Sequence, residues 1–208
     1  MMLQAVAHDV KNKLAELALR LMDRDIEAAA LALDSADKLS QALLLDNPEQ
    51  LVTHIDATAP ADLAEELVAV HGQLFPSKRV TIDVQHAPTL WYYDVSLMRL
   101  AVSNILHNAL KHCVSGVSLS IREEQASLVF EVRDDGPGFP DELLVSAWTD
   151  VTATDVQRQH NIGYNTGLGL LLAHKIAMAH TLDKDGVVRA GSVTLFNDNG
   201  AVARITLP

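Results

Sequence analysis

The sequence predicts an α+β protein, with an N-terminal helical hairpin followed by an α/β sandwich of one mixed sheet and a helical layer. Two observations predict this class. Residues 2–46 carry apolar side chains at helical spacing, and residues 61–208 alternate between helical patterns and short runs typical of strands. A chain of 208 residues is long enough to bury one sizeable core and to carry a helical appendage.

Composition and charge narrow the class of protein. Hydrophobic residues make up 49% of the chain and charged residues 21%, which is typical of a globular protein rather than a disordered one. The formal net charge of -11 argues against nonspecific binding to nucleic acid, because neutralised phosphates supply most of that affinity. Cys113 is the single cysteine, so no intramolecular disulfide can form.

Hydropathy predicts no membrane insertion by this chain. No stretch approaches the roughly 20 apolar residues that a membrane helix needs. The start of the chain also lacks a basic region followed by an apolar core, so a secretory signal is not expected. We therefore expect a cytoplasmic protein.

The first predicted domain, residues 1–47, is the helical hairpin. Leu3, Val10 and Leu17 repeat every seven residues in its first helix, and a second helix with its own apolar stripe follows Asp25. Two helices cannot close a core alone. We therefore expect a homodimer in which two hairpins form a four-helix bundle.

The second predicted domain, residues 61–208, follows a linker at residues 48–60. Apolar spacing predicts its helices, and alternation between turn signals predicts its strands. A mobile stretch is expected from Gly136 to about Tyr164. The predicted elements are helix 61–74, strand 79–85, helix 94–113, strands 117–122 and 127–133, helix 167–180, and strands 192–196 and 201–207.

Three short motifs in the second domain carry chemistry. The segment Asn104–His112 places two amides one helical turn apart, and a neutral amide oxygen suits the hard cation Mg2+. The segment Asp134–Gly138 ends a strand with a carboxylate and a glycine turn, and such a carboxylate can accept a hydrogen bond from the amine of adenine. The segment Thr166–Leu170 leads through glycines into a helix, whose free N–H groups favour phosphate.

Each motif alone is weak, but together they resemble the ATP site of the GHKL (Bergerat-fold) ATPases and kinases. The closing segment Ala201–Pro208 and the upstream segment Ala7–Leu14 place the nearest resemblance among the sensor histidine kinases. The resemblance implies ATP and Mg2+ as cofactors and a Bergerat-type sandwich as the fold. Unlike most of that family, which has a very short link at this point, the chain carries ten residues at Thr181–Ala190.

The resemblance also assigns roles to residues of the nucleotide site. It makes Asn108 the metal ligand with Asn104 beside it, Lys111 a phosphate contact, and Asp134 the residue that selects adenine. Asp135 is expected to face solvent. The remaining implied nucleotide contacts are His112, Gly136, Gly138, Gly167, Leu168, Gly169 and Leu170.

By resemblance, and given the ATP motifs downstream, His8 is the expected phosphoacceptor. It flanks the apolar stripe of the first helix and should be accessible to solvent, and an unprotonated imidazole nitrogen is a nucleophile at neutral pH. By resemblance, Asp9 orients or activates the imidazole, and Asn12 positions the water that dephosphorylates the partner regulator. The other histidines lack the spacing of metal ligands and are interpreted as structural or surface residues.

The leading hypothesis is therefore an ATP-dependent protein histidine kinase of a two-component system. It would phosphorylate His8 and pass the phosphoryl group to an aspartate in the receiver domain of a response regulator. A separate sensor protein can supply its input. One alternative is a non-catalytic phosphotransfer or scaffold protein of the same fold. A serine kinase of the anti-sigma-factor type is a second alternative, although that branch has no need of the hairpin with His8 and Asp9.

Overall fold

The structure, a computed structural model, describes residue 28, residues 51–145 and residues 168–208. The predicted hairpin at residues 1–47 lies outside the described residues apart from Ala28, and so do His8, Asp9, Asn12 and Gly167. The described residues form the second predicted domain and the end of the predicted linker.

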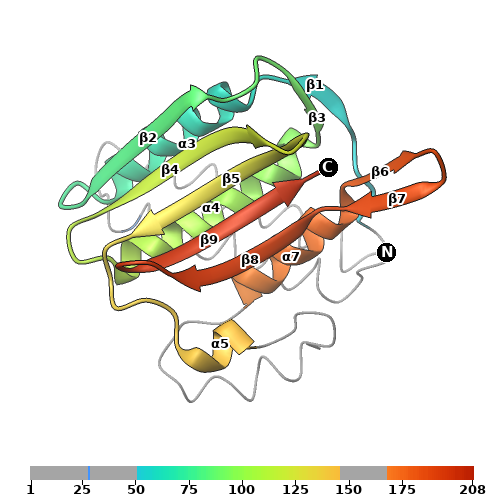
Figure 1. Cartoon of the computed structure of the whole chain (residues 1–208). Helices are drawn as coiled ribbons and strands as arrows, with labels where there is room; N and C mark the ends of the chain where they lie inside the picture. The colour runs from blue at the N-terminus through green and yellow to red at the C-terminus, as the bar shows by residue number, and fades with distance from the viewer. Residues whose placement is uncertain (1–27, 29–50, 146–167) are drawn as a thin grey trace, which may run out of the picture.

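The centre of the domain is a five-stranded mixed sheet in the order β2-β4-β5-β9-β8 (Figure 1). Strand β2 pairs with β4 in parallel, and the other three neighbouring pairs are antiparallel. The strands are β2 (Arg79–His86), β4 (Gly116–Glu124), β5 (Ser127–Asp134), β8 (Ser192–Asn197) and β9 (Ala201–Leu207).

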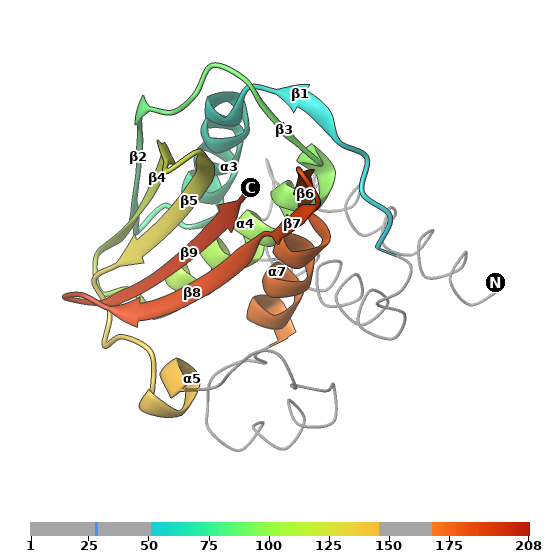
Figure 2. The ribbon, with the colours of Figure 1, turned by 45° about the vertical axis from the view of Figure 1, so that its right-hand side comes forward.

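Helices cover one face of this sheet, as Figure 2 shows from the side. They are α3 (Pro60–Leu74), α4 (Val95–His112) and α7 (Leu168–Ala179). The short helix α5 (Asp141–Val145) follows the turn after β5. This one-sided sandwich confirms the predicted α+β class with a single mixed sheet and a helical layer.

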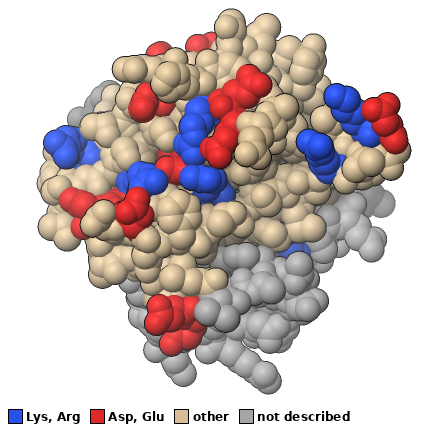
Figure 3. All heavy atoms as spheres, viewed as in Figure 1, with Lys and Arg blue, Asp and Glu red and all other residues tan. Residues whose placement is uncertain are grey.

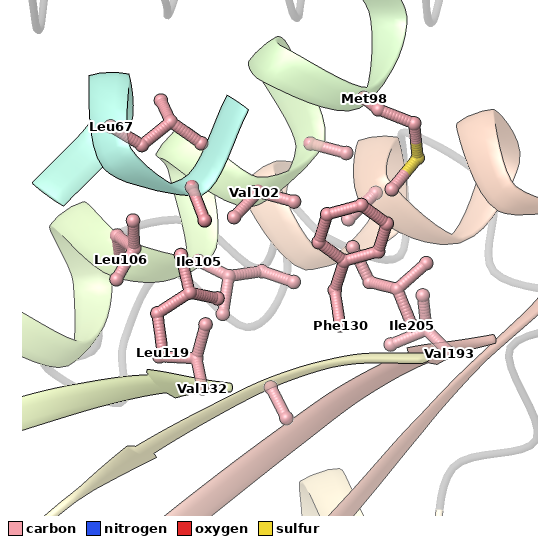
Figure 4. Close-up of a cluster of buried hydrophobic side chains, with 14 of the residues drawn as sticks. Leu67, Met98, Val102, Ile105, Leu106, Leu119, Phe130, Val132, Val193 and Ile205 are labelled. Atoms are coloured by element: carbon pink, nitrogen blue, oxygen red, sulfur yellow. The ribbon is translucent and has the colours of Figure 1, made fainter. Parts of the chain in front are cut away.

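Aliphatic side chains fill the space between the helices and the sheet (Figure 4). Val102 and Leu106 of α4 face Leu119 of β4, and they are all fully buried. Phe130 of β5 packs edge-to-face against Tyr93, with ring centroids 6.1 Å apart. Each such side chain contributes roughly 1.5–3 kcal/mol when it leaves water. The core therefore holds the helices that carry the candidate site on a rigid base.

Three features of the described domain were not predicted. Strand β1 (Asp56–Thr58) pairs with β3 (Trp91–Tyr93), so the end of the expected linker is part of a two-stranded sheet. The short helix α5 forms within the stretch that was expected to be mobile, five residues after Gly136. Strands β6 (Thr181–Lys184) and β7 (Val187–Ala190) form a separate hairpin.

One buried node joins the start of α4 to the end of α7. The carboxylate of Asp94 caps α4 by accepting hydrogen bonds from the N–H groups of Ser96 and Leu97, at 3.0 and 2.9 Å. The N–H of Asp94 donates to Nε2 of His180, at 3.0 Å, and His180 follows the last residue of α7. The second carboxylate oxygen of Asp94 accepts the N–H of His54, at 2.8 Å. The two helices therefore run antiparallel. His54, which precedes β1, is hydrogen-bonded to the same Asp94.

The face of the sheet away from the helices is closed by an ion-pair network around Glu131. Because Phe130 and Val132 point into the core, Glu131 between them points to the opposite face. Its carboxylate accepts hydrogen bonds from Arg122, Arg133 and Arg204 at 3.0, 2.7 and 2.9 Å. Figure 3 shows basic and acidic side chains side by side over the middle of this face. Charges here replace the second layer that a fully covered sheet would have.

Burial alone would raise the pKa of Glu131, but the hydrogen bonds from the arginines outweigh it and lower the pKa to about 2. Glu131→Gln should therefore lower the free energy of unfolding by about 1–3 kcal/mol near pH 7, the usual range for hydrogen bonds to a charged group. Because the folded pKa lies below the ordinary 4.5, this difference should be complete above pH 4.5 and shrink as the pH falls toward 2.

The measurement is urea unfolding of the parent chain and the variant at several pH values. Glu124→Gln is the matched control, because Glu124 is exposed and, among the described residues, its carboxylate pairs with Arg122 alone. It should change the free energy of unfolding by less than about 0.5 kcal/mol. Equal losses in the two variants would contradict the central role of Glu131.

Candidate nucleotide site

The amide-bearing side of the candidate site lies on the C-terminal half of α4. Asn104 is buried, and its Nδ2 donates to the carbonyl of Leu100 at 2.9 Å. Asn108, one turn further on, is half-buried, and Lys111 is exposed. Lys111 and His112 lie in the last turn, where the helix dipole favours cations. The helix thus presents an amide and an ammonium group on successive turns toward its C-terminal end.

The carboxylate side of the site is the turn after β5. Asp134 is half-buried, and its Oδ1 accepts the N–H groups of Gly136, at 2.8 Å, and of Ala201, at 3.2 Å. Within the described part of the chain, its Oδ2 receives no hydrogen bond. The side chain is therefore held in one orientation through Oδ1.

Gly136 brings this turn against the end of α4. A Cβ at Gly136 would lie 2.6 Å from the carbonyl oxygen of His112 and 2.9 Å from Oδ1 of Asp134. No real side chain fits at such distances. Since Asn108 lies four residues before His112, about 6 Å along the helix, the amide and the carboxylate belong to one region of the surface.

Asp135 faces solvent, as predicted, but it also has a structural role that the sequence analysis missed. Its carboxylate accepts the N–H groups of Val114 and Ser115, both at 2.9 Å, and of Gly116 at 3.2 Å. It also accepts the hydroxyl of Ser115. These hydrogen bonds hold the pKa of Asp135 well below its ordinary value. Asp135 therefore fastens the loop after α4 to the turn after β5.

Asn197 at the end of β8 is a second residue that the sequence analysis missed. Its Oδ1 accepts the N–H of Phe139 at 2.7 Å, and its Nδ2 donates to the carbonyl of Phe139 at 2.9 Å. Gly138, with φ of 85°, lies against the same amide, where a Cβ would approach within 2.8 Å. Asparagine next to Asp198 and Gly200 is typical of a tight turn, so the sequence showed no sign that Asn197 has a further role.

The third motif, Thr166–Leu170, leads into α7, which packs antiparallel to α4. Helix α7 begins at Leu168, so Gly169 and Leu170 lie in its first turn, and both are buried. Its C-terminal end is fastened at the N-terminus of α4 through His180 and Asp94. A helix of 12 residues is about 18 Å long, so its N-terminus lies level with roughly the twelfth residue of α4. That level is close to Asn108.

Among the other histidines of the described part, His71 has a structural role. His71 is buried between α3 and α4, where its Nδ1 contacts the carbonyl of Leu67 at 2.9 Å. Burial lowers its pKa, although hydrogen bonds partly oppose this effect. No group of three His, Cys, Asp or Glu side chains suited to a metal ion occurs within the described ranges.

The fold and this arrangement define an ATPase domain of the GHKL class. Residues 93–208 match the family described as histidine kinase-, DNA gyrase B-, and HSP90-like ATPase. This match covers more than half of the chain, so the chain belongs to that family, and it carries the catalytic core of the histidine kinase branch.

Sensor kinases are among the similar curated proteins. The sensor protein RstB of Escherichia coli (strain K12) is 30% identical over 190 residues, which cover 86% of this chain and 43% of RstB. The signal transduction histidine-protein kinase AfsQ2 of Streptomyces coelicolor is 30% identical over 202 residues, covering 95% of this chain and 30% of AfsQ2. The chain thus spans less than half the length of these relatives.

Solved histidine kinases share the fold. The Acinetobacter baumannii histidine kinase AdeS aligns with a TM-score of 0.63 at 14% identity, covering 96% of this chain and 95% of AdeS. Full-length ShkA in complex with AMPPNP aligns with a TM-score of 0.62 at 18% identity, covering 99% of this chain and 44% of ShkA. Among the described helices of this chain, none has the length and apolar character needed to cross a membrane.

The contact between Gly136 and His112 can be tested by stability. Gly136→Ala should lower the free energy of unfolding by about 1–3 kcal/mol, because its methyl group overlaps a backbone carbonyl. The matched control is Gly72→Ala in α3, where a Cβ meets no atom within 4 Å. That change should leave stability unchanged or raise it by up to about 1 kcal/mol, since alanine favours helix. Urea unfolding measures both, and a harmless Gly136→Ala would contradict the geometry.

Proposed function

We propose that this chain is the kinase core of an ATP-dependent protein histidine kinase in a two-component system. One observation supports it most. Asn108 on α4, Asp134 at the end of β5 and Gly169 at the start of α7 are far apart in the sequence, yet the fold brings them to the same end of the helical layer. Two contacts lie at that end, Gly136 against His112 and Asp135 with the loop after α4. The contact of His180 with Asp94 at the opposite end holds α7 antiparallel to α4, so that the start of α7 lies near Asn108.

In this proposal the protein recognises adenine through Asp134. The free Oδ2 of Asp134 accepts the exocyclic amine of adenine, while Oδ1 stays bonded to Gly136 and Ala201. Guanine carries a carbonyl at that position and cannot donate. His112 and the turn at Gly138 flank the nucleotide. The relative ShkA, solved in complex with AMPPNP, is consistent with a nucleotide in this fold.

The phosphate end is assigned to α4 and α7. Asn108 offers a neutral amide oxygen that fits Mg2+, with the buried Asn104 beside it, and Lys111 meets a phosphate as a point charge. When bound, Mg2+ would neutralise charge on the phosphates. Gly167, Leu168, Gly169 and Leu170 present the N–H groups and the positive end of the α7 dipole to the phosphates.

The phosphoryl group moves from ATP to His8 and then to a response regulator. An unprotonated ring nitrogen of His8 attacks the γ-phosphorus, the bond to the bridging β-phosphate oxygen breaks, and ADP leaves. Asp9 orients the imidazole and stabilises the positive charge that develops on it. An aspartate of a receiver domain then takes the phosphoryl group. In the proposed phosphatase reaction, Asn12 positions the water that removes the phosphoryl group from the regulator. A homodimer and a separate sensor complete the proposed system.

Asp134→Asn tests recognition of the base. The exocyclic amine of adenine donates a hydrogen bond, and the amide of the variant would meet it with either its own donor or an uncharged, weaker acceptor. Affinity for ATP should therefore fall about 10–100-fold. The measurement is calorimetric titration of the full chain with MgATP and MgGTP. Discrimination against GTP should decrease as well. The matched control, Asp198→Asn, removes an exposed carboxylate that pairs with Arg133 on the other face of the sheet. It should leave affinity unchanged, and an equal loss would refute the role of Asp134.

His8→Gln tests the phosphoacceptor. With γ-labelled ATP and Mg2+, the parent chain should acquire an acid-labile and base-stable label, as expected of a phosphohistidine. The variant should bind ATP as before and acquire no label, because no other group is proposed to accept the phosphoryl group. Equal labelling of the variant would assign the reaction to another residue. Binding without any labelling of the parent chain would favour the non-catalytic phosphotransfer or scaffold alternative.

A further inference from the structure

The hairpin β6–β7 occupies the ten residues at which most of the resembled family has a very short link, and it is closed at its base. Thr181 pairs with Ala190 at its base, and the N–H of Gly191 donates to the carbonyl of His180 at 2.9 Å. The residues on either side of the insertion are therefore hydrogen-bonded neighbours. Asp185 and Gly186, with φ of 56° and 77°, form the two-residue turn at the tip. The hairpin projects from the domain beyond the end of α7 (Figures 1 and 2).

The hairpin exposes more apolar surface than a solvated loop requires. All eight strand residues are exposed, and the exposed fractions of Leu182, Val187 and Val188 are 45%, 61% and 64%. An isolated two-stranded hairpin is marginally stable in water, and clustered aliphatic side chains on a surface indicate a contact region. This hairpin is therefore suited to pack against another segment.

The two faces of the hairpin differ in charge. Since paired residues share a face, Leu182, Lys184, Val187 and Arg189 lie on one face, which carries two cations and two aliphatic side chains. Asp183 and Val188 lie on the other, with Thr181 and Ala190. The first face therefore fits a segment that is both acidic and rich in aliphatic residues.

The chain itself brings such a segment to the base of the hairpin. The described domain begins at Leu51, which packs against the core, and the N–H of His54 is bonded to Asp94. Asp94 is bonded in turn to His180, whose carbonyl closes the hairpin. Residues 1–50 therefore join the domain within two hydrogen bonds of β6. They contain nine acidic and five basic residues, a formal net charge of -4, and many leucines and alanines.

We propose that the cationic face of the β6–β7 hairpin docks the N-terminal segment, residues 1–50, of the same chain. The aliphatic pair Leu182 and Val187 packs on apolar side chains of that segment, and Lys184 and Arg189 pair with its carboxylates. The consequence for catalysis rests on the proposed kinase function: the hairpin restrains the ATP-binding domain relative to the segment that carries His8.

Site-directed photo-crosslinking of the full chain tests the docking. A benzophenone amino acid at Val187 should, on irradiation, link to a peptide within residues 1–50 of the same chain, as identified by mass spectrometry after digestion. Val188 is the matched control, because it has a similar exposed fraction and lies on the opposite face. Links from Val187 to other regions, links that double the chain mass, or equal links from Val188 would each overturn the proposal.

Charge reversal separates docking from mere proximity. Lys184→Glu together with Arg189→Glu should reduce the yield of the Val187 link about fivefold, because two attractive pairs become repulsive. An unchanged yield would show that the cations take no part in docking, and would overturn their assignment. Both residues are exposed, so the fold should be retained, as circular dichroism can verify.

Deletion of residues 181–190, which joins His180 directly to Gly191, tests the consequence for catalysis. Nucleotide affinity should stay within about twofold of the parent, because the nucleotide site lies at the other end of α7. The initial rate of labelling from γ-labelled ATP should change by more than about threefold. An unchanged rate would overturn the restraint. Absence of labelling in the parent chain would instead refute the kinase function, while the crosslinks would still decide the docking.

Discussion

The buried node at Asp94 is the interaction on which the arrangement of the helices depends. One carboxylate caps α4 and receives the N–H of His54, while the N–H of the same residue reaches His180 at the end of α7. A buried carboxylate is costly unless it is hydrogen-bonded, and three backbone N–H groups satisfy Asp94. Because the node lies at one end of both helices, it sets where their other ends meet.

The candidate site occupies that other end, and it is assembled from backbone as much as from side chains. Gly136 admits the carbonyl of His112, and Asp135 gathers three successive N–H groups of the loop after α4. These contacts require a small residue and an acceptor at fixed places.

Much of the fold could be predicted from the sequence, because long amphipathic helices and alternating strands carry strong periodic signals. The bounds of α3, α4 and β5 were predicted to within one or two residues. The missed elements β1 and β3 have three residues each, too few to show a period. Hairpin β6–β7 did carry a signal, since Asp185-Gly186 between valines and polar residues is typical of a tight turn. The ten extra residues were recognised as a departure from the resembled family, but no strands were assigned to them.

The site was predicted unevenly for a related reason. Motifs indicated Asn108, Asp134 and Gly136, and the contacts of Asp134 and Gly136 require an acceptor and a residue without a side chain. Roles that depend on contacts between residues far apart in the sequence could not be predicted. Asn197 became identifiable only when its amide was found on both backbone groups of Phe139. Likewise, His180 was read correctly as structural, but its partner Asp94 lies 86 residues away in the sequence. Periodicity cannot indicate such a partner.

The geometry also constrains how a phosphoacceptor could meet the nucleotide. Residues 1–50 join the domain at the Asp94 end of α4, whereas Asn108 lies fourteen residues further along, or about 21 Å. A phosphoacceptor at His8 would therefore have to return along the helical layer, a span that the 42 residues between His8 and Leu51 can cover even when helical. A surface that contacts residues 1–50 where they join the domain would set the direction in which these residues leave it. The β6–β7 hairpin stands at that point, which is why a ten-residue insertion far from the nucleotide site can bear on the transfer of a phosphoryl group.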